Sequence, residues 1–214
     1  MKTELLSHFG DDLMVANIAR VSYDKFSNDL TTRDQKLINY LAKHKHTTPF
    51  RHPQLQFRVQ CPIFVERQLF THQIGWARNS ISGRYVDFSD TYDYPEQLRY
   101  QSSDSKQGSS GNIPEDDNKK FQDKISQLEV LSQGLYQEMS DFGVAKEQCR
   151  IHLPLSLETK FMWTGSFQAF VHLCGLRLKP DAQMETQLVV GDMLEQVKNL
   201  PNNPFEYSLT AFNL

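Results

Sequence analysis

The chain has 214 residues, 39% of them hydrophobic and 11% aromatic, and a formal net charge of −3. This composition suits one domain with a hydrophobic core, and it disfavours a general DNA- or RNA-binding role, which needs a basic face. An anionic small substrate fits, because nearby arginines matter more than net charge. The three cysteines (Cys61, Cys149 and Cys174) have neither CxxC nor zinc-ligand spacing, so we expect no metal site and a reducing cytoplasm. No apolar run suits a signal peptide or membrane span, so we expect no membrane partner.

In the N-terminal half, apolar residues at helical spacing predict a short helix over 13–22 and a second over 32–44, with an N-cap at Thr32 and Asp34. Residues 54–61 alternate apolar and polar side chains, which predicts a half-buried strand. A helix over 63–72 is expected to follow it.

The C-terminal half begins with the polar, Gly/Ser-rich segment 101–120, which predicts a long mobile loop or a ligand-gated lid rather than a domain linker. Helices are expected over roughly 117–140 and 143–149, and long helices over 155–176 and 181–198. Several long helices around a few strands favour an α+β domain that spans residues 1–214.

Three polar clusters interrupt these elements. Residues 68–85 combine a helix end with hydroxyls, glycines and arginines, as a phosphate or nucleotide site requires, although an ordinary surface turn would show the same pattern. Arg150 closes a helix, where the helix dipole alone also explains an arginine. Gln168 and His172 share one helix face and could be satisfied core groups. Arg177 follows an apolar stretch and needs an anionic partner, for which the residues alone favour an acidic side chain such as Asp181 or Glu185 over a ligand.

Taken together, these segments resemble the flavin-dependent thymidylate synthase family, whose signature is Arg-His-Arg, seven residues and then Ser. The matching stretches occur in the family's order: Ala19-Arg20-Val21-Ser22, His46-x-Thr48-Pro49-Phe50, Pro62-Ile63-Phe64-Val65-x-Arg67-Gln68, Thr71-His72-Gln73, Ser82-Gly83-Arg84-Tyr85, Lys106-Gln107-Gly108-Ser109, Arg150-x-x-Leu153-Pro154 and Leu176-Arg177-x-x-x-Asp181-Ala182-Gln183-x-Glu185.

The chain departs from the family at several positions. Thr71 and Gln73 replace the two signature arginines, and one extra residue precedes Ser82. Ser80 stands where many members have Glu. Some members have Asn, Arg and Asn where this chain has Ser166, Gln168 and His172, respectively. The His-Gln pair resembles phage-type members, which would place the enzyme in a host cytoplasm. Arg78 could supply a displaced guanidinium.

The resemblance implies a homotetramer of long helices packed on a mostly antiparallel sheet, with active sites shared between subunits. It implies conversion of dUMP to dTMP, with methylenetetrahydrofolate as carbon donor and FAD, reduced by NADPH, as hydride source. Arg177 and Ser82 are the expected catalytic residues. The expected dUMP contacts are Gln68, Thr71, Ser82, Gly83, Arg84, Arg150 and Arg177. The expected FAD contacts are Ser22, His46, Thr48, His72, Gln73, Ile74, Asn79, Ser80, Ser166, Gln168 and His172.

Two alternatives stay open at this point. The altered flavin-facing residues would also suit a related flavin enzyme that alkylates another pyrimidine nucleotide. The lost signature arginines would suit an inactive nucleotide-binding or regulatory relative. The residues show no GxGxxG loop, so a Rossmann-type flavin site is not expected.

Overall fold

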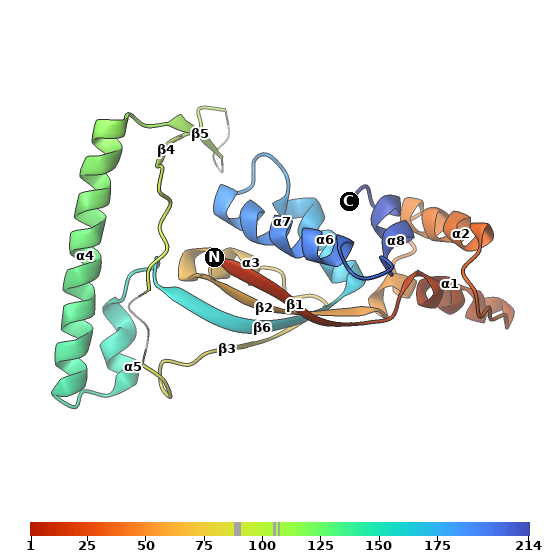
Figure 1. Ribbon diagram of the computed structural model, residues 1–214, viewed down its shortest axis with the longest axis horizontal. Coiled ribbons are helices and arrows are strands. Elements are labelled where there is room, and N and C mark those ends of the chain that lie inside the picture. The colour runs from red at the N-terminus through yellow and green to blue at the C-terminus, as the bar shows by residue number, and fades with distance from the viewer. Residues whose placement is uncertain (88–90, 105, 107) are drawn as a thin grey trace.

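The computed structural model describes residues 1–87, 91–104, 106 and 108–214. Its centre is a four-stranded antiparallel sheet in the order β1-β2-β6-β3, with helices packed on one face (Figure 1). The bounds of these strands are Lys2–Phe9 for β1, Gln54–Pro62 for β2, Glu158–Ser166 for β6 and Trp76–Ser80 for β3. This mixed, antiparallel architecture confirms the predicted α+β class.

The helices are α1 Asp12–Arg20, α2 Thr32–Lys43, α3 Ile63–Leu69, α4 Glu115–Asp141, α5 Lys146–Cys149, α6 Phe167–Arg177, α7 Met184–Lys198 and α8 Glu206–Ala211. Most expected helices therefore form within a few residues of their predicted bounds. The cap of α2 is Thr31 rather than Thr32, because Thr31 and Asp34 form a reciprocal capping box. Short 3-10 turns follow α1 at Val21–Tyr23 and precede β2 at Thr48–Arg51, the latter labelled η2.

The predicted single helix over 155–176 is wrong, because its first half is strand β6. Phe161 and Trp163 are buried while Lys160 beside them is exposed, so this stretch has the two-residue period of a strand. Pairing along the whole length of β2 satisfies its backbone groups. The Ser166 hydroxyl then accepts the Ala169 N–H at 3.2 Å and starts α6.

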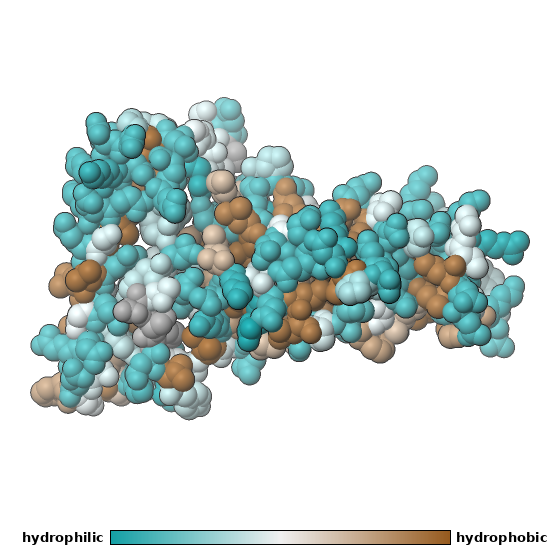
Figure 2. All heavy atoms as spheres, in the orientation of Figure 1, coloured by the Kyte–Doolittle hydropathy of each residue, from teal (hydrophilic) through white to brown (hydrophobic). Residues whose placement is uncertain are grey.

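The hydrophobic core lies between the sheet and helices α3, α6 and α7. Phe57 of β2 stacks on Phe170 of α6, and Trp76 of β3 stacks on Trp163 of β6 with ring centroids 4.0 Å apart. Figure 2 shows the same side as mainly hydrophilic, with hydrophobic surface in the centre of the view. In the described parts of the chain, no helix is both long and apolar enough to cross a bilayer.

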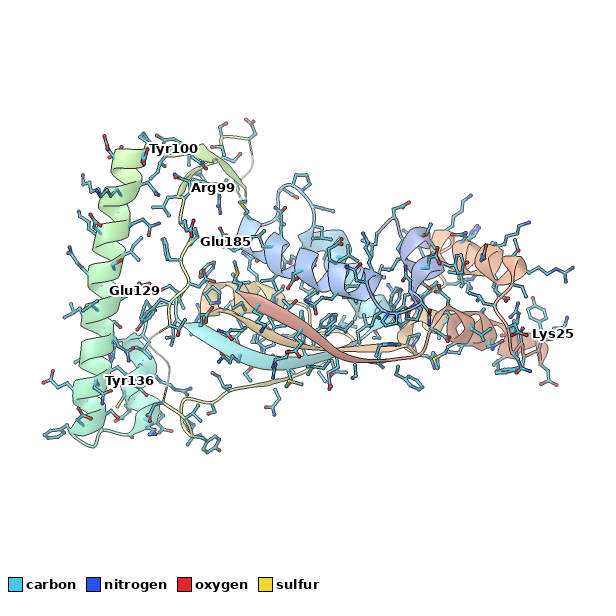
Figure 3. All side chains as sticks on the ribbon, viewed as in Figure 1. Lys25, Arg99, Tyr100, Glu129, Tyr136 and Glu185 are labelled. Carbon is cyan, nitrogen blue, oxygen red and sulfur yellow. The ribbon has the colours of Figure 1, made fainter. Side chains whose placement is uncertain are left out.

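The polar segment 101–120 is not a simple loop. It contains the ends of a β-hairpin, with strands β4 Arg99–Gln101 and β5 Ser109–Asn112, and the first residues of α4. Residues 105 and 107, and so part of the matched stretch at 106–109, lie outside the described residues. Arg99 joins the hairpin to α7 through an ion pair with Glu185 at 2.6 Å (Figure 3). The mobility of this segment stays a prediction.

Candidate functional site

A cavity of about 730 Å³ opens where one side of α6, from its first turn to Arg177, meets the turn between α3 and β3. Its wall comes from four stretches of chain: the η2 turn, the start of β2, residues 71–76 and α6. Its size lies within the range of small-molecule sites. Six of the expected flavin contacts line it: His72, Gln73, Ile74, Ser166, Gln168 and His172. Two expected nucleotide contacts, Thr71 and Arg177, line it as well.

The turn at 71–76 reaches α6 closely because of Gly75. This residue has φ +78°, which favours glycine, and a Cβ atom there would lie 3.0 Å from both Ala169 and the Ser166 hydroxyl. The Gly75 carbonyl also accepts the N–H of Ser166 at 3.0 Å. The signature residues on the turn are thereby held against the first turn of α6.

Arg177 at the end of α6 is fixed by three hydrogen bonds to the end of α3 and the turn that follows it. Its Nε donates to Nε2 of His72 at 2.8 Å, and its Nη2 donates to the Thr71 hydroxyl at 2.8 Å and the Gln68 carbonyl at 3.4 Å. The expected acidic partners were wrong, since Glu185 pairs with Arg99 instead. Arg177 therefore lines the cavity without forming a salt bridge to an acidic side chain of the described residues.

His72 is neutral in this arrangement. Burial, followed by the nearby Arg177 cation and His172, lowers the pKa of His72 from 6.5 to about 4. Its Nε2 must be unprotonated to accept from Arg177, so the proton of the ring resides on Nδ1. Arg177 consequently has a neutral partner that does not cancel its charge.

Gln68 is held by side chains that the sequence analysis gave no role. The Thr186 hydroxyl donates to its Oε1 at 3.1 Å, and its amide nitrogen donates to the side chain of Gln183. Gln183 and Thr186 lie at the start of α7, so this helix positions a predicted nucleotide contact. The only sequence signal was their place in or beside the matched stretch that ends at Glu185.

The remaining predicted nucleotide contacts form a second group near α5. Arg84 pairs with Glu147 of α5 at 3.0 Å, and its backbone N–H donates to the Ser82 hydroxyl at 3.3 Å. Gly83 lies between these two residues, and Arg150 follows α5 directly. Figure 1 shows α5 beside α4 at one end of the molecule, whereas α6 packs over the sheet. None of the four lines the cavity that contains Arg177.

The other expected flavin contacts lie outside the lining of this cavity: Ser22, His46, Thr48, Asn79 and Ser80. The Ser80 hydroxyl donates to Glu66 at 3.5 Å. Arg78 is not in the cavity wall either, because its guanidinium lies 3.0 Å from the centre of the Phe70 ring. Within one chain, Arg78 therefore does not supply this cavity with the displaced guanidinium that the sequence had suggested.

Two buried polar atoms of the cavity wall have no hydrogen-bond partner in the described structure: the Trp76 indole nitrogen and the Gln168 side-chain oxygen. An unpaired buried donor or acceptor is costly, and such groups often mark ligand positions. A flavin ring carries both hydrogen-bond acceptors and an N–H donor, so one indole N–H and one amide oxygen match its chemistry. Trp76 was missed by the sequence analysis, although it closely follows the expected flavin contacts at 72–74.

The fold and cavity thus define a protein with a small-molecule site that combines a fixed guanidinium, a neutral histidine and unpaired polar groups. Residues 4–201 match the model of the family described as thymidylate synthase complementing protein. The chain belongs to this family, which confirms the resemblance.

Curated relatives and solved structures agree. The chain is 36% identical to a flavin-dependent thymidylate synthase of Thermus thermophilus over 194 residues, covering 91% of this chain and 70% of the relative. It is 38% identical to the enzyme of the same name from Kosmotoga olearia, covering 86% and 79%. A UMP/dUMP methylase, PolB, from Streptomyces cacaoi bound with 5-Br UMP superposes with a TM-score of 0.86 at 26% identity, covering 99% and 93%.

Proposed function

We propose that this chain is a flavin-dependent thymidylate synthase that converts dUMP to dTMP. Methylenetetrahydrofolate would donate the carbon, and FAD, reduced by NADPH, would be the flavin. Membership of the family and the names of the curated relatives support the reaction. The methylase bound with a uridine nucleotide supports a pyrimidine nucleotide as substrate.

The observation that carries the proposal is Arg177 held by a neutral His72. A guanidinium paired with a carboxylate would have its field largely cancelled. Arg177 keeps its full positive charge and is already oriented, so it can stabilise negative charge that develops on a uracil ring when its carbon 5 attacks. The three hydrogen bonds occupy Nε and Nη2, which leaves Nη1 for the ligand among the described contacts.

Bound flavin would supply the hydride, which is chemistry that no side chain can provide. The chain would orient the flavin through the Trp76 N–H as donor and the Gln168 oxygen as acceptor, the two unpaired atoms of the wall. Ser166, which caps α6, would place a further hydroxyl beside the ring. Ser82 would orient the pyrimidine base.

Cysteine nucleophiles have no place in this proposal. Cys61, Cys149 and Cys174 are all free and buried. Burial raises the pKa of the Cys61 thiol strongly and that of Cys174 to about 12, so neither forms a thiolate near neutral pH. Free, unpaired thiols also support a cytoplasmic location.

The division of the nucleotide contacts supports a homotetramer with shared sites. Gln68, Thr71 and Arg177 meet beside one cavity, whereas Arg84 and Arg150 lie by α5. In the proposed assembly, the α5 group of one subunit completes the cavity of another. The predicted FAD contacts outside the cavity wall would reach the cofactor in the same way.

The test is an assay of the purified chain with added FAD, dUMP, methylenetetrahydrofolate and NADPH, with dTMP measured by mass spectrometry. UMP and dCMP in place of dUMP test the nucleotide preference. Arg177→Ala should abolish dTMP formation while its circular dichroism spectrum stays unchanged. The control is Arg33→Ala, which removes an exposed arginine of α2 and should leave dTMP formation unchanged. Near-normal turnover by Arg177→Ala would refute the assignment of Arg177, and no dTMP from the unmodified chain would refute the function.

A further inference from the structure

The cavity has an uneven charge. Arg51 and Arg177 are the charged side chains among the described residues that line it, and no Asp or Glu is found there. His72 adds no charge, because its pKa is lowered to about 4. A cavity with two guanidiniums and no carboxylate favours an anionic ligand.

The two guanidiniums differ in how far they are already used. Arg177 is held by three hydrogen bonds to His72, Thr71 and Gln68. Arg51 makes one long hydrogen bond in the described structure, from Nη2 to the Thr47 hydroxyl at 3.3 Å, and its side chain is exposed. Most of the donors of Arg51 therefore remain for a ligand at the cavity.

The backbone of Arg51 is firmly placed even though its side chain is exposed. Phe50 beside it is fully buried and packs edge-to-face on Phe212 with ring centroids 4.9 Å apart. On the other side, the Gln54 amide donates to the Arg51 carbonyl at 3.0 Å. An anchored backbone limits the positions of the guanidinium to the cavity rim, which lowers the ordering cost of binding.

The same cavity lacks two cations that the family signature would place there. Thr71 and Gln73, which stand at the signature arginine positions, both line the wall. Both side chains are uncharged, so neither can form an ion pair with a phosphate group. Arg177, the other guanidinium of the cavity, is held by the signature residues and is assigned above to the uracil ring. An anionic cofactor would therefore depend on Arg51, which remains uncommitted on the rim.

We propose that Arg51, with the Thr47 hydroxyl beside it, binds the phosphate groups of the flavin nucleotide and replaces the cation missing at Gln73, an expected FAD contact. This inference rests on the proposed flavin site and adds a specific anchor to it. A planar guanidinium can make two parallel hydrogen bonds to phosphate oxygens, which an ammonium group cannot. Arg51→Lys should therefore restore only part of the binding.

The experiment measures binding of oxidised FAD, FMN and riboflavin to the full chain by the change in flavin fluorescence, with no turnover required. The variants are Arg51→Ala and Arg51→Lys, with Arg33→Ala as the matched control for loss of one exposed arginine. We expect Arg51→Ala to weaken the binding of FAD and FMN about 10- to 100-fold, the range for loss of a charge-assisted hydrogen bond. Riboflavin, which has no phosphate, should bind both forms equally. Added salt should weaken FAD binding more in the unmodified chain than in Arg51→Ala.

The outcomes separate the two proposals. Equal FAD affinity in Arg51→Ala and the unmodified chain, with flavin bound by both, would refute the role of Arg51 and leave the flavin site standing. Equal losses of FAD and riboflavin would also refute it, since the residue would then act on the shape of the cavity. If the unmodified chain binds none of the three flavins, the flavin site and the Arg51 anchor both fail.

Discussion

His72 provides a sharp test of the site, because its neutral state should appear in the pH dependence of stability. In the folded chain its pKa is lowered from 6.5 to about 4, so between these values the unfolded chain binds a proton that the folded chain does not. Stability should therefore fall as the pH falls from 6.5 towards 4. With these two pKa values, proton linkage lowers the free energy of unfolding by about 2 kcal/mol between pH 7.5 and pH 5. Because His72 is only half-buried, solvent screening reduces this to about 1 kcal/mol.

The assay is urea unfolding at pH 7.5 and pH 5, at one protein concentration, for the unmodified chain and for His72→Gln. Glutamine can still accept the Arg177 hydrogen bond but cannot titrate, so the variant should lose about 1 kcal/mol less on acidification. Other histidines cancel in the comparison. NMR titration of the His72 ring in the unmodified chain should show no protonation above about pH 5. Equal pH dependence in both chains, or a ring that titrates near its ordinary pKa, would refute the neutral acceptor.

Three further predictions concern packing and chemistry. Gly165→Ala would place a methyl group inside the Trp76 ring, so the indole must move. We expect the free energy of unfolding, measured in urea, to fall by about 1–3 kcal/mol and flavin binding to weaken. Unchanged tryptophan fluorescence would contradict this. Asp12→Ala removes the carboxylate that accepts two backbone N–H groups at the start of α8, at 2.7 and 3.0 Å; unfolding should become easier by about 2 kcal/mol, and an unchanged urea midpoint would argue against this cap. Cys61→Ala and Cys174→Ala should keep dTMP formation near normal if they fold; loss of turnover in a folded variant would point to a thiol mechanism.

Local patterns were sufficient for much of the fold. The alternation at 54–61 identified β2, and capping and helical spacing identified α2, α4 and α7. The prediction failed at 155–176, where an apolar run suits either a strand or a buried helix. The antiparallel partner β2 decided between them, and nothing within the run itself could reveal that partner.

The candidate site shows the same division. Motif order pointed to His72, Gln168 and Arg177, and the structure places all three at one cavity. The acid expected beside Arg177 was wrong, because Glu185 is taken by Arg99 from the distant β4 strand. Arg51 and Trp76 carried no sequence signal strong enough to select them.

By itself, the sequence determined the family, the fold class and most of the residues at the cavity, because these depend on local periodicity and on an ordered set of motifs. Only the tertiary structure decided which charges meet. It paired Arg177 with a neutral histidine, gave Glu185 to Arg99 and brought Arg51 to the cavity rim. Such pairings join residues as many as 105 positions apart, and the free energy of a charge depends on the neighbours that folding supplies.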